Sequence, residues 1–229
     1  MIKFENVTKK FMRKTALQGV NLELTKGKIV GLVGENGSGK STTLKLIAGL
    51  THPTKGRITV EGMQANHRIS EHVSYLSELD VYYGFYNVGQ TIEFYASQFS
   101  DFNKEKADEI REYMKLDSNA KLKHLSKGNR GRLKIVLALA RQAPVILLDE
   151  PLSGLDPMVR DSIVKGLISF IDLEKQVVLI TTHEIKEIEM ILDEVIAIKD
   201  GEIIGHHDVE KLRSEQNLGI VDWMTKIYE

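Results

Sequence analysis

The stretch of sequence that decides the fold is Gly34-Glu35-Asn36-Gly37-Ser38-Gly39-Lys40-Ser41-Thr42. It has the pattern G-x-x-x-x-G-K-[ST], follows a short apolar run at residues 29–33 and precedes a predicted helix at residues 42–49. Glycines let the backbone turn tightly, so that consecutive N–H groups point at one anion. The N-terminal end of the following helix adds a partial positive charge. These features predict a phosphate-binding loop between a strand and a helix.

Two side chains of this loop are expected to act on a bound nucleotide. We expect Lys40 to reach its β- and γ-phosphates and the Ser41 hydroxyl to ligate Mg²⁺. The predicted nucleotide-binding residues of the loop are Gly34, Asn36, Gly37, Ser38, Gly39, Lys40, Ser41 and Thr42.

Bulk composition narrows the class of protein. The chain has 229 residues, a net charge of −1 and a pI of about 6.7, which gives no general electrostatic reason to expect a nucleic-acid partner. It contains no cysteine, which excludes disulfides and thiolate metal sites. The N-terminal residues 2–7 resemble a strand rather than a signal peptide, and the longest apolar run, residues 135–140, is too short to span a bilayer. If the protein works at a membrane, we expect another chain to supply the crossing.

The order of apolar patterns predicts an α/β fold with an inserted helical segment. Residues 1–25 alternate apolar and polar side chains, which indicates β-strands. Further strands are predicted at residues 57–60, 73–76, 145–148 and 177–181, with a hairpin of residues 195–199 and 202–205 about Asp200-Gly201. Helices are predicted at residues 91–99, 103–116, 128–142, 157–173 and 184–192, followed by two short helices within residues 208–229.

Two carboxylates follow the buried strand Val145–Leu148. The carboxyl ends of parallel strands are where ligands bind, so we expect Asp149 to hold Mg²⁺ and Glu150 to orient or deprotonate an attacking water. Alone, such a pair could be two solvated acids at a strand end; the phosphate loop upstream favours the catalytic interpretation. His183 ends the next predicted strand and could contact the γ-phosphate. The predicted catalytic residues are Lys40, Glu150 and His183.

A second anion site is predicted at Leu125-Ser126-Lys127-Gly128-Asn129, which enters a helix. Ser126 is a favourable N-cap, and the free amides of Lys127 and Gly128 point along the helix dipole. Two phosphate sites in one chain suggest that two chains clasp nucleotide face to face, with residues 153–156 lining the seam. The basic segment between the first strands contains Phe11, which could stack on an adenine ring or fill the interior of a β-meander.

The order of these motifs resembles the ATP-binding subunit of the ABC transporter family over essentially the whole chain. The matching motifs are the phosphate loop at 34–42, the signature at 125–129, the Walker B strand at 145–150, the D-loop at 153–156 and the switch histidine His183. The resemblance implies a RecA-like core, an N-terminal antiparallel β subdomain and a helical subdomain. The expected division is β subdomain and core at 1–76, helical subdomain at about 77–143, core again at 144–205 and C-terminal helices at 206–229.

The resemblance also implies how such a protein works. Two subunits, identical or paralogous, form a head-to-tail dimer that holds two ATP molecules with Mg²⁺, each between Lys40 of one subunit and Ser126 and Gly128 of the other. Phe11 falls where the family places its adenine-stacking aromatic residue. The expected location is the cytoplasmic face of a membrane, on a separate integral permease that the aromatic segment Tyr82–Tyr86 could contact; the alternative for these rings is the core of the helical subdomain.

The chain departs from the family pattern at two places. Lys127 and Asn129 replace Gly and Gln of the usual signature, and Lys127 could either approach the partner's γ-phosphate or face solvent. Glu78 stands where the family has a metal-sensing Gln, and a carboxylate can ligate Mg²⁺ but cannot donate a hydrogen bond. Both variants resemble exporters of peptides, antibiotics or drugs. The alternatives are the ATPase of a small-solute importer, a soluble ABC ATPase and a P-loop kinase.

Overall fold

The computed structural model describes residues 1–228 except 13, 79–82 and 184. Its centre is a sheet of six strands in the order β10-β9-β3-β8-β7-β6. These strands are β10 (Glu202–Asp208), β9 (Glu194–Lys199), β3 (Ile29–Val33), β8 (Val177–Thr182), β7 (Val145–Asp149) and β6 (Val73–Leu76). All neighbouring pairs are parallel except β9 and β10, which form the predicted hairpin about Asp200-Gly201.

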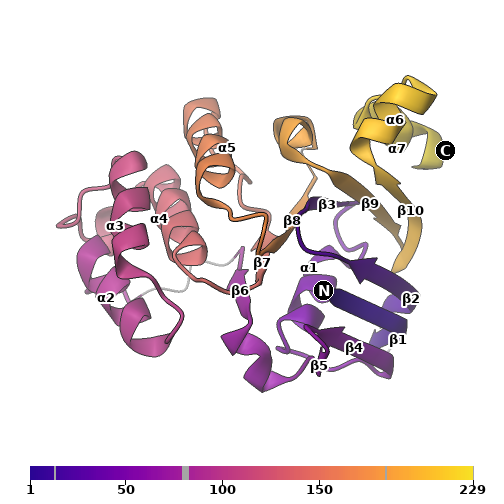
Figure 1. The fold of residues 1–229 in the computed structure, drawn as a ribbon, viewed down its shortest axis with the longest axis horizontal. Helices are drawn as coiled ribbons and strands as arrows, with labels where there is room; N and C mark the ends of the chain where they lie inside the picture. The colour runs from indigo at the N-terminus through magenta and orange to yellow at the C-terminus, as the bar shows by residue number, and fades with distance from the viewer. Residues whose placement is uncertain (13, 79–82, 184, 229) are drawn as a thin grey trace.

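A second, antiparallel sheet is built from the N-terminal residues. Its strand order is β2-β1-β4-β5, with β1 (Ile2–Phe11), β2 (Lys14–Leu24), β4 (Lys55–Val60) and β5 (Met63–Gln64). Helix α1 (Lys40–Ile47) lies between this sheet and the central sheet (Figure 1). Phe11 is the last residue of β1 rather than part of a loop, because β1 continues to pair with β2 up to Phe11 and Lys14.

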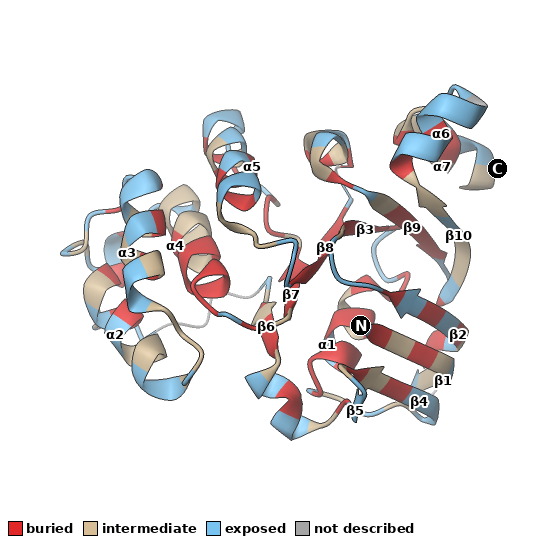
Figure 2. Ribbon diagram, in the orientation of Figure 1, coloured by how far each residue is buried: buried red, intermediate tan, exposed pale blue. Residues whose placement is uncertain are grey.

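The buried residues alternate between two cores, one on each face of the central sheet. In β7, Val145 and Leu147 pack with α1 and the antiparallel sheet, whereas Ile146 and Leu148 pack with the helices on the other face. This period of two is what a strand buried on both faces requires. Figure 2 shows the result as continuous burial along β7 and β8, with most of α1 buried as well.

The helices cover the second face and one end of the molecule. Helices α2 (Val88–Gln98), α3 (Lys104–Tyr113) and α4 (Lys127–Leu139) form a group beside β6, next to α5 (Pro157–Phe170) (Figure 1). The C-terminal helices α6 (Val209–Gln216) and α7 (Ile220–Tyr228) lie beside β9 and β10. The predicted α/β class with an antiparallel β subdomain and inserted helices is confirmed; the exact division at 76, 143 and 205 stays a prediction.

One predicted helix is wrong in its described part. Of the predicted helix 184–192, residues 185–192 do not form an α-helix: two 3₁₀ turns lie at Ile185–Glu187 and Glu189–Ile191. Three isoleucines there lie three positions apart, with Ile185 and Ile188 buried and Ile191 packed against the same core. A repeat of three matches the 3₁₀ geometry better than the 3.6 of an α-helix.

Within the part of the chain that the structure describes, no helix combines the length and apolar character needed to cross a bilayer.

Candidate functional site

The phosphate loop connects the end of β3 to the start of α1 and depends on glycine at three positions. Gly37 and Gly39 have φ of 84° and 120°, in the region that favours glycine. A Cβ on Gly39 would lie 2.7 Å from the carbonyl oxygen of Ala16, and one on Gly34 would lie 2.3 Å from that of Ile198. The loop is therefore wedged between β2 and β9, which hold its backbone in place.

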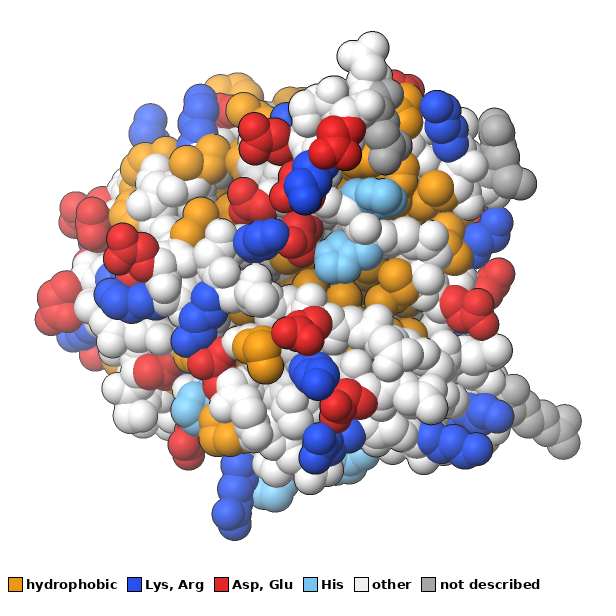
Figure 3. Space-filling model, turned by 45° about the vertical axis from the view of Figure 1, so that its right-hand side comes forward, with side chains coloured by type: hydrophobic (Ala, Val, Ile, Leu, Met, Phe, Trp, Pro, Cys, Tyr) orange, Lys and Arg blue, Asp and Glu red, His pale blue; other side chains and the backbone are white. Residues whose placement is uncertain are grey.

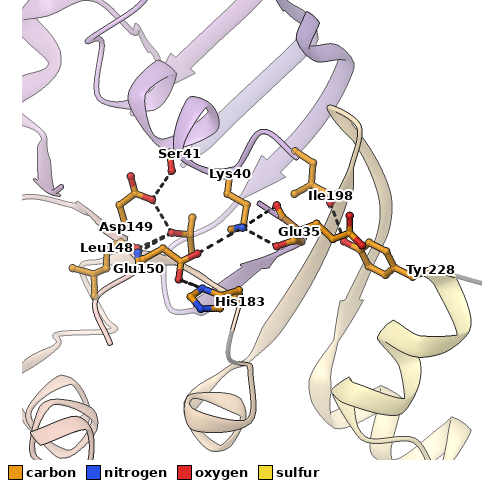
Figure 4. A network of polar contacts seen from close by, with 11 residues as sticks. Glu35, Lys40, Ser41, Leu148, Asp149, Glu150, His183, Ile198 and Tyr228 are labelled. Atoms are coloured by element: carbon orange, nitrogen blue, oxygen red, sulfur yellow. Dashed lines mark hydrogen bonds and ion pairs between the residues drawn. The ribbon is translucent and has the colours of Figure 1, made fainter. Parts of the chain in front are cut away.

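Lys40 is buried at the start of α1 and turns its side chain back over the loop (Figure 4). Its Nζ donates to the carbonyl oxygens of Gly34 at 2.7 Å and Glu35 at 3.2 Å, and lies 3.6 Å from Oε1 of Glu150. This cation stands between the phosphate loop and the end of β7, where an incoming phosphate would replace the carboxylate as its partner.

Asp149 ends β7 and accepts three hydrogen bonds from hydroxyl groups. Ser41 Oγ and Thr181 Oγ1 both donate to its Oδ1 at 2.9 Å, and Tyr75 Oη donates to Oδ2 at 3.1 Å. The carboxylate is 2% exposed. Burial, followed by the charge of Asp149 and the hydrogen bond to it, raises the pKa of Tyr75, so this phenol remains a donor at physiological pH. These hydrogen bonds hold the Asp149 carboxylate in place, with the Ser41 hydroxyl beside it.

Glu150 follows directly and has an unusual backbone. Its φ is 49°, uncommon for a residue other than glycine, and its N–H donates to Thr181 Oγ1 at 3.0 Å. Its Oε2 lies 2.8 Å from His183 Nδ1 and accepts from the His183 N–H at 3.3 Å. Strained backbone at a strand end typically marks a functional residue. Here the turn aims one carboxylate at both Lys40 and His183.

A cavity of about 500 Å³ brings most of the predicted site residues together. Its lining includes Phe11, Lys14, Asn36, Gly37, Gly39, Lys40, Ser41, Thr42, Glu78, Glu150, Ser153 and His183. Phe11 stands at the rim with 47% of its surface exposed and Lys9 Nζ 4.6 Å from its ring centre, so the ring is not interior packing. Of the two alternatives for Phe11, packing inside a β-meander does not fit this exposure, and stacking on an adenine ring stays a prediction.

Ser126 and Gly128 lie outside this cavity. Ser126 is the N-cap of α4 and its Oγ accepts from the Asn129 N–H at 3.2 Å. A Cβ on Gly128 would lie 2.9 Å from Val159 of α5, so this residue must be small. Within one chain, therefore, neither Ser126 nor Gly128 lines the cavity that contains Lys40.

Lys127 is exposed, and its side chain also reaches across to the D-loop. Its Nζ lies 2.1 Å from the position that a Cβ on Gly154 would take, and it lines a small cavity of about 130 Å³ together with Glu78 and Glu150. Gly154, with φ of 63°, therefore accommodates the lysine that replaces the usual signature glycine. In this structure Lys127 contacts the D-loop of its own chain.

Two residues of the site were missed from the sequence. Thr181 and Tyr75 hold Asp149 in place, and Thr181 also binds the backbone of Glu150. The available signal was the change from aliphatic to hydroxyl side chains at the end of the run Val177–Thr182. That signal identifies the end of a strand, but it does not tell which strand lies next to it in the sheet.

The donor set fits a nucleotide phosphate with Mg²⁺. Ser38 Oγ is buried inside the loop with no hydrogen-bond partner among the described residues, which leaves a hydroxyl for a phosphate oxygen. Within those residues no cluster of three or more His, Asp or Glu side chains could hold a metal alone. Mg²⁺ at a phosphate site needs only one or two protein oxygens, because phosphates and water fill its other positions. Ser41 and Asp149 carry such oxygens; ligation of Mg²⁺ by Ser41, Asp149 and Glu78 stays a prediction.

Comparisons with known proteins place these motifs in one family. Residues 17–153 match the family model described as "ABC transporter". The chain is 33% identical to the Nod factor export ATP-binding protein I of Burkholderia lata, over 87% of this chain and 68% of that protein. It is also 33% identical to the sulfate/thiosulfate import ATP-binding protein CysA of Synechocystis, over 86% of this chain and 58% of that one.

A solved structure extends the match to the fold. The ATP-binding cassette MJ0796, determined as a dimer in a post-hydrolysis state with ADP and phosphate, is 26% identical and superposes with a TM-score of 0.80 over 91% of this chain and 98% of that one. The chain belongs to the ABC transporter family, as an ATP-binding subunit with ATPase activity.

Proposed function

We propose that this ATPase subunit closes on MgATP as a dimer and powers a separate membrane permease. The observation that carries the proposal is the separation of the two anion sites. The cavity beside Lys40 contains Glu150 and His183 but neither Ser126 nor Gly128. A second subunit, bound head to tail, would bring its signature helix to the open side of that cavity. The dimeric state of MJ0796 supports this arrangement.

In this proposal hydrolysis is an in-line attack of water on the γ-phosphorus of ATP. Glu150 accepts the proton of the water as the new O–P bond forms and the bond to ADP breaks. Lys40 neutralises the negative charge on the phosphates, and His183 orients the Glu150 carboxylate and contacts the γ-phosphate. Mg²⁺, held by Ser41 and Asp149 with Glu78 nearby, would supply further positive charge. Phe11 stacks on the adenine.

The Glu150→Gln variant tests the assignment of the base. We expect hydrolysis to slow at least a hundredfold, about 3 kcal/mol of barrier, because the amide cannot accept the proton. ATP affinity should be kept or increased, because the change removes the carboxylate that pairs with Lys40 in the free protein. Glu202→Gln, at an exposed position of β10, is the matched control and should hydrolyse normally. Near-normal turnover by Glu150→Gln would reject Glu150 as the base.

We further propose that the permease exports a peptide, an antibiotic or a drug, and that this chain is bound to the permease at the cytoplasmic face of the membrane. The support is the pair of exporter-like variants at Lys127 and Glu78 and the similarity to a Nod factor export protein. The equal identity to CysA favours a small-solute importer as the second candidate. No nucleic-acid partner is expected, since basic and acidic side chains intermingle on the face seen in Figure 3.

The proposed contact with the permease involves exposed aromatic rings before α2. Tyr83 and Phe85 are 55% and 67% exposed, with their ring centres 5.5 Å apart. Tyr86 is instead partly buried against the core, so it follows the packing alternative. Tyr82, included in the predicted patch, lies outside the described residues. Aromatic side chains that keep such exposure are suited to anchor a partner.

A further inference from the structure

Tyr228, near the end of α7, contacts the strand that supports the phosphate loop. Its Oη donates to the carbonyl oxygen of Ile198 at 2.9 Å (Figure 4). The neighbouring Lys199 Nζ donates to the Tyr228 carbonyl oxygen at 3.0 Å and lies 5.4 Å from the centre of its ring. The other end of α7 is firmly held, because Ile220 and Trp223 are buried in the core.

The Ile198 carbonyl lies where the phosphate loop leaves the sheet. The pairing of β3 with β9 ends at Val33 and Ala197, one residue before Gly34 and Ile198. The same carbonyl oxygen would lie 2.3 Å from a Cβ on Gly34, so it is packed directly against the first residue of the loop. Gly34 in turn accepts the shortest hydrogen bond of Lys40, at 2.7 Å. A short chain of contacts thus connects the Tyr228 hydroxyl to Lys40.

Tyr228 also forms part of the wall beside the loop. Two cavities, of about 670 and 310 Å³, are both lined by Tyr228 and Glu35. Burial, followed by the negative charge of Glu35, raises the pKa of Tyr228, so its hydroxyl keeps its proton. Tyr228 and Glu35 thus line the same two cavities beside the loop.

We propose that Tyr228 is a positioning residue for ATP binding, holding the start of the phosphate loop through the Ile198 carbonyl. The inference rests on the proposed binding of ATP at Lys40. Tyr228 is outside the cavity that contains Lys40 and Glu150, so it acts through the loop and not on the nucleotide. When the loop loses this hold, only a fraction of molecules keeps the binding conformation, and the apparent affinity falls by that fraction.

The test is the Tyr228→Phe variant of the full chain, which keeps the ring and removes the hydroxyl. One neutral hydrogen bond corresponds to a loss in ATP affinity of about 2- to 10-fold. We expect the KM for ATP and the Kd for ATP to rise by that factor, while kcat at saturating ATP stays within about twofold, because bound phosphate restores the loop. Amide hydrogen exchange should accelerate at residues 34–39 without a general increase.

Tyr113→Phe is the matched control. Tyr113 is also a tyrosine in the last turn of a helix, 42% exposed, but its ring packs edge-on against Phe170. The control should leave KM and loop exchange unchanged. Unchanged KM and exchange in Tyr228→Phe, or an equal effect in both variants, would overturn the inference while wild-type ATP binding stands. Absence of ATP binding by the wild type would instead reject the proposed function itself.

Discussion

Thr181 connects both carboxylates of the site to the neighbouring strand, and replacing it with valine tests that connection. Valine has the same shape, so packing in β8 is kept, and Thr181 is fully buried. The variant loses the hydrogen bond to the Asp149 carboxylate and leaves the Glu150 N–H without its acceptor. A hydrogen bond to a charged group contributes about 1.5–3 kcal/mol, and a buried unsatisfied donor costs about 1–3 kcal/mol.

Because the two losses share one oxygen atom and do not simply add, we expect the free energy of unfolding to fall by about 2–4 kcal/mol. Urea denaturation of the purified chain measures this change. Steady-state ATP hydrolysis should show kcat reduced by about 10- to 100-fold, because the backbone turn that aims Glu150 loses its support. The KM for ATP should stay within about threefold, since Thr181 does not line the cavity beside Lys40.

Thr181→Ser is the matched control, because it keeps Oγ and removes only a methyl group. It should retain most of the turnover and lose about 1 kcal/mol of stability. The reasoning is refuted if Thr181→Val unfolds within about 0.5 kcal/mol of the wild type, or if the serine variant loses as much kcat as the valine variant.

Three further predictions concern stability and assembly. Burial alone would raise the pKa of Glu194, but hydrogen bonds from Lys28 and His206 lower that pKa below its ordinary value of 4.5. The stability that this carboxylate contributes is therefore present above pH 4.5 and is lost as the pH falls through the folded-state pKa. Glu194→Gln should flatten the acid limb of a curve of unfolding free energy against pH, and an unchanged limb would contradict this. Met114 is 1% exposed, and shortening it to alanine leaves a cavity. Met114→Ala should therefore lower the free energy of unfolding, measured with denaturant, by about 2–5 kcal/mol. A loss below about 1 kcal/mol would show that the surrounding helices close the cavity. The double variant Tyr83→Ala with Phe85→Ala should keep its ATP affinity but co-purify less permease than the wild type. The control Tyr113→Ala should co-purify as much permease as the wild type. Equal recovery of the permease with the double variant and with the wild type would reject the aromatic contact.

The motifs that lie within one short segment were predictable from the sequence. The phosphate loop, the Ser126 cap and the Asp149–Glu150 pair each depend on local backbone chemistry, and the structure has the predicted strand, turn or helix at each. Contacts across the sheet were not predictable in this way. Tyr75 and Thr181 meet at Asp149 because β6 and β8 flank β7, an order that no local pattern records.

The same reason explains the features of the C-terminal part. The hairpin about Asp200-Gly201 and the two final helices were predicted, because turn chemistry and apolar periodicity are local signals. The contact between Tyr228 and Ile198 was not, since it depends on how α7 packs against β9 and β10. At residues 185–191 the apolar repeat was assigned to the wrong helix type.

The central claim is that each ATP site is completed by a second subunit, and mixing two inactive variants tests it most directly. Lys40→Ala lacks the phosphate-loop cation and Ser126→Ala lacks the signature hydroxyl, so each alone should hydrolyse ATP very slowly. In a mixed head-to-tail dimer one site lacks both groups and the other is intact. With random pairing and independent sites, the mixture should recover about a quarter of wild-type turnover. A mixture as inactive as its two components, under conditions where the wild type hydrolyses ATP, would contradict the account.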